Sequence, residues 1–356
     1  MQAVMFNGGL ELRDDAEVRP PEPHEVRVRI HRAGLCHSDL SVINGTIPCP
    51  TPVVLGHEGA GVVEDVGSAT RKVKPGDHVV ITTLASCGQC DACSRGEPTQ
   101  CRDTFGRMRK PFTVGGVAAY QFANAGVFAE HTVVAESQAV VIDPAVPFAS
   151  ACLIGCAVVT GAGAVLNRAR VQPGQSVLVI GAGGIGLSVI QAAKLAGATR
   201  IVVVDANPDK AGAAAEFGAT DFVDASTTED TVATVKGLGL GGGVDHSFEC
   251  VGQPSLIRQA IDLLDWGGTC TLLGVPKLGT EASFMVASMY NDKSILGCRY
   301  GSTRPHHDIP LIVRLYLDGR FKLDEMVSKT YPLAAIADAI RDLEGGRLNR
   351  GVLELA

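Results

Sequence analysis

Residues 176–186 read S-V-L-V-I-G-A-G-G-I-G, and this run decides the fold class of the chain. Its first five residues have the continuous apolar, β-branched pattern of a buried parallel strand. The glycines that follow match G-x-G-x-x-G, and an apolar helical pattern begins at residue 185. In such a loop the first glycine makes the tight turn, the second admits a pyrophosphate and the third lets the helix pack on the sheet. The cofactor-binding residues expected here are Gly181, Gly183, Gly184, Ile185 and Gly186.

Strand and helix patterns continue to alternate after this loop, with strands expected at residues 200–204, 244–249 and 268–273. This alternation predicts an α/β fold with a doubly wound parallel sheet. Asp205 follows the second strand, where a carboxylate accepts the ribose hydroxyls of NAD and repels the 2′-phosphate of NADP. Asp205 could instead cap the next helix, and Lys210 is either a ribose contact or a solvated surface residue.

The first 150 residues have a different sequence pattern. Short runs rich in β-branched residues, for example at residues 25–31, 61–66 and 78–82, are separated by Pro and Gly. These runs predict half-buried strands of a barrel or sandwich. After residue 297 only two helices and a final strand are expected, which is too little for a separate domain. We therefore predict one domain from residues 1–157 and 298–356, and a second from residues 158–297.

Composition narrows the class of protein. The chain has 356 residues, 42 glycines and a net charge of −7, which argues against a dedicated nucleic-acid or anionic-membrane binder. Residues 1–12 lack the basic start and apolar core of a secretory signal. Eleven cysteines without such a signal read as reduced thiols. We expect a cytoplasmic protein.

A cluster of four cysteines lies in C-G-Q-C-D-A-C-S-R-G-E-P-T-Q-C at residues 87–101. The cysteines are Cys87, Cys90, Cys93 and Cys101. Their close spacing allows one loop to surround a tetrahedral ion, and closed four-sulfur sites hold structural zinc. The alternatives are two disulfides or an iron–sulfur cluster; disulfides would need an oxidising compartment, and the spacing matches neither common ferredoxin pattern.

A second metal site is predicted from Cys36, His57 and Cys156. Taken individually, Cys156 could be a packed core residue and His57 could cap a turn. Together they supply two thiolates and an imidazole, which suits a catalytic zinc with one exchangeable position.

In combination these motifs resemble the zinc-dependent alcohol dehydrogenases of the medium-chain dehydrogenase/reductase superfamily, over effectively the whole chain. The motifs that carry the resemblance are the four-cysteine loop, A-G-L-C-H-S-D-L, L-G-H-E-G-A-G, G-A-G-G-I-G, I-G-C-A-V-V-T-G and V-D-H-S-F-E-C-V-G. The resemblance implies a GroES-like β-rich catalytic domain, a Rossmann domain, two zinc ions per chain and NAD. It also implies reversible oxidation of an alcohol, in which hydride passes from a zinc-bound alkoxide to the nicotinamide.

The resemblance further implies roles for individual residues. Ser38 matches the hydroxyl that accepts the substrate proton, Glu58 a residue that approaches the zinc during ligand exchange, and Asp39 the carboxylate that orients His57. The matches to cofactor-contacting positions are His37, Thr160 and Arg350, and we add Val275 to the expected cofactor-binding residues.

Three departures from the family pattern affect the expected substrate. The histidine that ends the proton relay in many relatives is Ser41 here, so water or His37 would have to complete the relay. The acidic and basic substrate-binding positions of the glutathione-dependent formaldehyde dehydrogenases are Ile47 and Phe105, which favours a plain apolar alcohol. The basic residues Arg107, Arg109 and Lys110 follow the cysteine loop, either as solvated surface or as a substrate anchor.

Other functions remain open from the sequence: a dehydrogenase for thiol-bound formaldehyde or a polyol, or a non-catalytic nucleotide-binding relative. By resemblance we expect a homodimer or homotetramer joined through the Rossmann domain, with residues 269–285 as the contact.

Overall fold

The computed structural model describes residues 1–355, which form two compact units. Unit 1 contains residues 1–157 and the residues from Thr303 onward, and unit 2 contains Val158–Ser302. Residues 298–302, which the sequence assigns to the first domain, belong to unit 2. There Gly301 lies so close to helix α4 (Val159–Gly163) that a Cβ on it would be 2.3 Å from the Val159 carbonyl oxygen.

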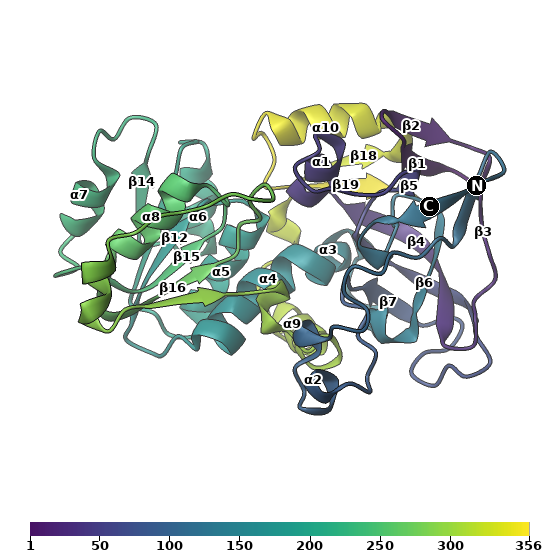
Figure 1. Ribbon diagram of the computed structural model, residues 1–356, viewed down its shortest axis with the longest axis horizontal. Coiled ribbons are helices and arrows are strands. Elements are labelled where there is room, and N and C mark those ends of the chain that lie inside the picture. The colour runs from purple at the N-terminus through teal and green to yellow at the C-terminus, as the bar shows by residue number, and fades with distance from the viewer. Residues whose placement is uncertain (356) are drawn as a thin grey trace. The chain divides into compact units, whose positions relative to one another are not determined.

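Unit 1 is built on two sheets of mainly antiparallel strands (Figure 1). The smaller sheet has the order β2-β1-β5-β9-β8-β3, and the larger has the order β11-β7-β6-β4-β19-β18 with β10 also paired to β4. Burial alternates along the middle of β4, where Val26, Val28 and Ile30 point from one face of the larger sheet into the main core. The strands are β1 (Ala3–Phe6), β2 (Leu10–Arg13), β3 (Ala16–Val18), β4 (Glu25–Gly34), β5 (Val53–Val54), β6 (Glu58–Val66), β7 (His78–Ile81), β8 (Phe112–Val114), β9 (Val117–Gln121), β10 (His131–Ala135), β11 (Ala139–Val141), β18 (Val327–Pro332) and β19 (Arg350–Glu354).

The final strand of unit 1 lies inside the larger sheet, between β4 and the edge strand β18. Strand β19 pairs antiparallel with β4, with Val352 opposite Gly34, and parallel with β18. Residues from both ends of the chain therefore share one sheet. The helices of this unit are α1 (His37–Ile43), α2 (Asp91–Ser94), α3 (Phe148–Leu153), α9 (Pro305–Leu317) and α10 (Ile336–Glu344).

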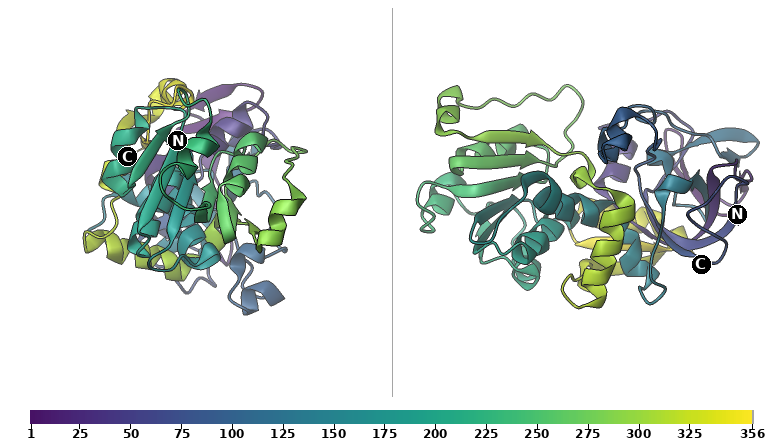
Figure 2. Two further views of the ribbon diagram at one scale, coloured as in Figure 1. Left: turned by 90° about the vertical axis from the view of Figure 1, so that its left-hand side faces the viewer. Right: turned by 90° about the horizontal axis from the view of Figure 1, so that it is seen from below.

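Unit 2 is a six-stranded parallel sheet with the order β14-β13-β12-β15-β16-β17 (Figures 1 and 2). This 3-2-1-4-5-6 order is that of a Rossmann fold, in which the first strand lies at the topological switch point. Its strands are β12 (Ser176–Ile180), β13 (Arg200–Asp205), β14 (Asp221–Asp224), β15 (Val244–Glu249), β16 (Leu264–Leu272) and β17 (Ser294–Gly297), and its helices after α4 are α5 (Gly184–Leu195), α6 (Lys210–Phe217), α7 (Thr231–Lys236) and α8 (Pro254–Asp262).

The fold class predicted from the sequence is confirmed: a β-rich part accompanies a parallel Rossmann sheet. The observed elements differ mainly at their ends. The first of the two helices expected after residue 297 begins at Pro305, because proline suits a first helical turn and Asp308 Oδ2 accepts the Arg304 amide there at 2.8 Å.

The chain passes from unit 1 to unit 2 within one helical segment, Phe148–Ala169. This segment is long and apolar enough to resemble a membrane span, with a mean hydropathy of 2.0. However, 83% of its most apolar window is buried inside the protein, as in the core helix of a globular fold.

Candidate functional site

The buried carboxylate of Asp39 organises the first group of metal-ligating side chains. Asp39 lies on α1 with no exposed surface. Its Oδ2 accepts the Cys36 amide at 3.3 Å, and its Oδ1 accepts the Gly56 amide at 3.1 Å and lies 3.1 Å from His57 Nδ1. One carboxylate thus connects the turn after β4 with the turn before β6.

This arrangement prepares His57 to hold a metal through its second nitrogen. Because Nδ1 faces Asp39, Nε2 is the free ligand atom, and it is buried with no hydrogen-bond partner among residues 1–355. Ligand atoms of Cys36, His57, Glu58 and Cys156 all lie within 4.8 Å of one another. Two thiols and an imidazole with an orphaned buried nitrogen fit a zinc ion.

Cys156 comes to this group from an irregular part of the long helix. Residues Ile154–Val158 form a π-helical turn between α3 and α4. Such a turn interrupts the regular α-helical spacing and is frequent at functional sites. The sequence predicted the ligand but not the π turn that presents it.

Glu58 and Arg350 form a buried ion pair beside the same cluster. Arg350 Nη2 donates to Glu58 Oε2, and both side chains are almost completely buried. Burial raises the pKa of Glu58 to about 7. Gly34 leaves room for this carboxylate, since a Cβ there would lie 2.4 Å from Glu58 Oε2. The sequence named both charged residues but not their pairing.

The four cysteines of residues 87–101 form a second, separate cluster. The sulfur atoms of Cys87, Cys90, Cys93 and Cys101 lie within 4.8 Å of one another. Amides of Gln89 and Cys90 donate to Cys87 Sγ at 3.4 and 3.3 Å, and the Cys87 amide donates to Cys101 Sγ at 3.5 Å. Burial works against ionisation of Cys101, but amide donors such as Cys87 lower its pKa to about 6. Amide donors around closely spaced sulfurs favour thiolates and therefore fit a bound zinc.

The glycine-rich loop of unit 2 lies between β12 and α5, as the sequence predicts for a phosphate site. A Cβ on Gly186 would lie 1.9 Å from the Gly181 carbonyl oxygen, so the close packing of strand and helix needs glycine. Asp205 ends β13, and its carboxylate accepts the Ala182 amide at 2.6 Å and the Asn207 amide at 2.8 Å. Lys210 begins α6 and is buried, which lowers its pKa.

The remaining predicted residues are divided between the two units. In unit 1, Ser38 Oγ lies 3.8 Å from Cys36 Sγ, and His37 is exposed at the start of α1. In unit 2, Thr160 is buried on α4, whereas Val275 is exposed after β16.

Sequence reasoning missed Phe122, whose ring meets the His57 imidazole edge-on with centroids 5.3 Å apart. A single aromatic residue in a strand-like region gives no signal that distinguishes it from core packing.

The basic residues after the cysteine loop also have specific contacts. Arg109 Nη1 donates to the buried Glu25 at 3.1 Å, and Lys110 lies over the Tyr120 ring at 4.2 Å. These contacts engage two of the three basic side chains within unit 1.

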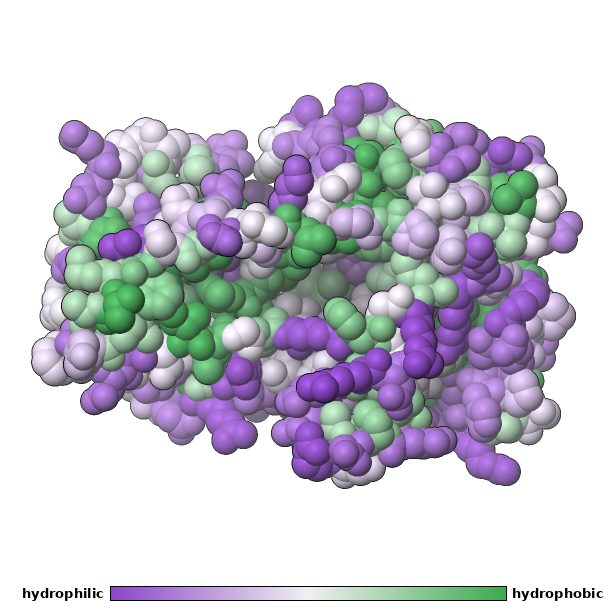
Figure 3. Space-filling view, viewed as in Figure 1, coloured by the Kyte–Doolittle hydropathy of each residue, from purple (hydrophilic) through white to green (hydrophobic). Residues whose placement is uncertain are grey.

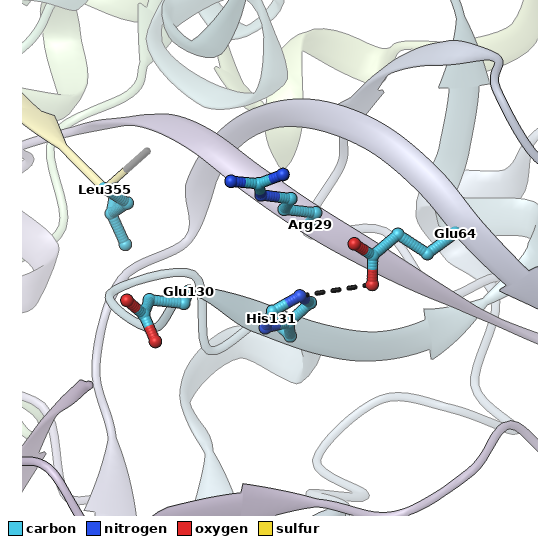
Figure 4. A pocket seen from close by; sticks show the side chains of 5 residues that line it. All are labelled: Arg29, Glu64, Glu130, His131 and Leu355. Carbon is cyan, nitrogen blue, oxygen red and sulfur yellow. Dashed lines mark ion pairs between the residues drawn. The ribbon is translucent and has the colours of Figure 1, made fainter. Parts of the chain in front are cut away.

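A polar depression elsewhere on unit 1 is distinct from these clusters (Figure 4). Its lining is mainly charged, and His131 Nε2 pairs with Glu64 Oε2 at 3.1 Å. The lining residues are Arg29, Glu64, Glu130, His131 and Leu355. None of them belongs to the two cysteine clusters or the glycine-rich loop.

Comparison with known proteins agrees with both units. Residues 22–144 match the alcohol dehydrogenase GroES-like domain, and residues 184–318 match the zinc-binding dehydrogenase family. The chain is 36% identical to a probable S-(hydroxymethyl)glutathione dehydrogenase 1 of Schizosaccharomyces pombe, over 96% of this chain and 93% of that protein.

Solved structures extend the likeness to the full chain. An alcohol dehydrogenase zinc-binding domain protein from Burkholderia ambifaria superposes with a TM-score of 0.95 at 36% identity, covering 100% of this chain and 98% of the other. The benzyl alcohol dehydrogenase of Acinetobacter calcoaceticus gives 0.94 at 34% identity, covering 100% and 99%. The chain therefore belongs to the zinc-dependent alcohol dehydrogenases of the medium-chain dehydrogenase/reductase superfamily, oxidoreductases that interconvert alcohols and carbonyl compounds with zinc and NAD(H).

Proposed function

We propose that this chain oxidises an uncharged, apolar primary alcohol, with benzylic alcohols as its preferred class and NAD as its hydride acceptor. The observation that carries the substrate class is the edge-on contact of Phe122 with His57, which supplies an aromatic surface beside the candidate metal ligand. Aromatic rings prefer such edge-to-face and offset contacts. A solved relative with 34% identity is a benzyl alcohol dehydrogenase, which supports the same class.

In this proposal Cys36, His57 and Cys156 hold the catalytic zinc. When bound, zinc supplies Lewis acidity that eases loss of the alcohol proton. Ser38 Oγ takes that proton and passes its own hydroxyl proton on to water or His37, a role supported by its position 3.8 Å from Cys36 Sγ. Asp39 keeps His57 in the tautomer whose Nε2 is free.

Glu58 and Arg350 complete the surroundings of this site. Their buried ion pair keeps the Glu58 carboxylate beside the ligand atoms. In this proposal Glu58 would approach the zinc during ligand exchange, while Arg350 and the exposed His37 would contact the cofactor pyrophosphate. Cys87, Cys90, Cys93 and Cys101 hold the second zinc, which is structural.

The preference for NAD rests on Asp205. Its carboxylate accepts an amide of the glycine-rich loop and stands at the end of β13. A 2′-phosphate at that position would meet negative charge. The other proposed cofactor contacts are Gly181, Gly183, Gly184, Ile185, Gly186, Lys210, Thr160 and Val275.

The thiol-adduct reaction is the second candidate, since curated relatives bear the name S-(hydroxymethyl)glutathione dehydrogenase. The charged positions that would hold such an adduct are Ile47 and Phe105 here. Ile47 packs against the core of unit 1, and Phe105 is 66% exposed. Neither side chain offers a charge to glutathione, so the apolar alcohol is favoured.

We further propose that two copies associate through the β16–β17 side of unit 2. Strand β17 is the sheet edge, and apolar residues gather on this side (Figure 3). The exposed apolar residues on this side are Trp266, Leu278, Phe284, Met285, Val286 and Tyr290. An exposed apolar group next to a free strand edge is typical of an interface between copies.

A cytoplasmic location is supported by the eleven free cysteines.

Cys36→Ala should reduce the zinc content from two ions per chain to one and abolish alcohol-dependent NADH formation, because a ligand is lost. Asp39→Asn should keep the fold but lower activity or zinc affinity by about 10- to 100-fold. Metal analysis and NADH absorbance measure both effects. Cys152→Ala, a buried cysteine outside both clusters, is the control and should keep two zinc ions. Full turnover by Cys36→Ala would refute the ligand assignment.

Cys93→Ala should also remove one zinc, but its main effect should be on stability. The free energy of unfolding should fall by roughly 3 kcal/mol or more, because structural metal binding contributes directly to folding. Denaturant unfolding and metal analysis measure the change, with Cys49→Ala as the matched control. Two zinc ions retained in Cys93→Ala would contradict a metal role for this loop.

Phe122→Ala should lower kcat/KM for benzyl alcohol by about tenfold and affect ethanol less, since an aromatic pair contributes ~0.5–1.5 kcal/mol beyond its buried area. Leu317→Ala, at an exposed position that ends α9, should change neither. The measurement is steady-state NADH formation with benzyl alcohol, ethanol, and formaldehyde with glutathione, each with NAD and with NADP. Preference for the glutathione adduct would select the second candidate, and preference for NADP would refute the role of Asp205.

The double variant Leu278→Glu/Val286→Glu should shift the molar mass in solution to that of one chain. Both residues are strongly exposed, at 81% and 71%, so two added charges should oppose association without disturbing the core. Light scattering after size exclusion measures the mass. Val117→Glu, an exposed position on β9, should leave the assembly intact. An unchanged mass in the double variant would exclude this surface as the interface.

A further inference from the structure

Glu249 is a fully buried carboxylate at the carboxyl end of β15, and the function proposed above does not use it. Its Oε1 accepts the amides of Val251 at 2.9 Å and Gly252 at 2.7 Å. Its backbone carbonyl accepts the amides of Leu273 at 2.8 Å and Gly274 at 3.0 Å. One residue therefore connects the loop after β15 with the loop after β16.

These loops pack against each other and against the glycine-rich loop without spare space. A Cβ on Gly274 would lie 2.0 Å from the Gly252 nitrogen, and a Cβ on Gly181 would lie 2.7 Å from Val251 Cγ2. Gly252 itself has a φ of +91°, which favours glycine. Movement of the Val251–Gly252 turn would therefore displace both neighbouring loops.

All three loops lie at the carboxyl edge of the parallel sheet. Strands β12, β15 and β16 are adjacent in unit 2 (Figure 1). Ligands of such sheets bind at this edge, near the switch point. Val251 and Val275, on two of the loops, are apolar yet exposed there, so their side chains are available to a cofactor.

We propose that Glu249 is a positioning residue for NAD(H) binding. Its carboxylate holds the Val251–Gly252 turn against Gly181 and Gly274, and so shapes the dinucleotide site before the cofactor binds. This inference rests on the dinucleotide site proposed above.

A role in fold stability alone accounts less well for a carboxylate at position 249. Glu249 Oε2 is buried and has no hydrogen-bond partner among residues 1–355. An unpaired buried polar atom costs stability. An apolar residue would avoid that cost but could not hold the two amides.

The test compares NADH binding by Glu249→Leu, which is similar in size but cannot accept a hydrogen bond, with that of the wild-type zinc-loaded protein. The Kd for NADH, measured by fluorescence titration, should rise by about tenfold or more, as expected when one to two hydrogen bonds that order the site are lost. Zinc content and the KM for alcohol at saturating NAD should stay unchanged. An unchanged Kd would overturn the proposal.

Asp245 provides a matched control on the same strand. It lies at the opposite, amino end of β15 and accepts the amide and the hydroxyl of Ser176, both at 2.7 Å. Asp245→Asn should lower the melting temperature but not weaken NADH binding. An equal loss of NADH affinity in both variants would show a general effect of destabilisation and would refute a specific role for Glu249.

Two further variants keep the test decisive if Glu249→Leu fails to fold. Glu249→Gln retains an oxygen acceptor, so its Kd should stay within about threefold of wild type; a tenfold loss would contradict the proposal. Gly252→Ala leaves the carboxylate intact but crowds Val275, with its Cβ 2.9 Å from that backbone, and should raise the Kd. Wild-type protein that bound no NADH would refute the dinucleotide site itself, which is a different failure.

Discussion

The carboxylate of Asp39 links the segments of unit 1 that carry two of the candidate ligands of the first metal site, Cys36 and His57. It accepts amides from Cys36 and Gly56 and faces Nδ1 of His57. A single short acidic side chain can do this only because α1 begins directly after β4 and returns its first turn toward the start of β6. The positions of a thiol and an imidazole, which lie 21 residues apart in sequence, are therefore set by one buried group.

The glycine-rich loop could be predicted from sequence because its chemistry and its geometry lie in one short segment. A strand, three glycines and a helix are enough to specify the turn, and β12 and α5 begin and end within a few residues of the expected bounds. The four-cysteine loop is predictable for the same reason. Its four sulfurs come together without help from distant parts of the chain.

Contacts between distant segments could not be predicted in this way. Glu58 and Arg350 were both expected to matter, but 292 residues separate them and nothing in either motif indicates that they pair. Phe122 is one apolar residue among many, and only the structure brings its ring to His57. Glu249 belonged to a recognised motif, yet its hydrogen bonds to two loop amides depend on the turn at Gly252. Resemblance identifies residues, whereas packing determines which of them act together.

The insertion of β19 between β4 and β18 affects the order in which the protein can assemble during synthesis. Unit 2 is one continuous segment, so all its strands are available once residue 302 has left the ribosome. Domains generally fold as units as they emerge. Unit 1 must wait, because residues 32–34 at the end of β4 receive their β19 partner, and Glu58 its guanidinium, only when residues 350–354 have been made. Until then residues 32–34 of β4 lack a partner on one side and the Glu58 carboxylate lacks its ion pair, so the nascent chain carries a complete parallel-sheet unit while its β-rich unit is still incomplete.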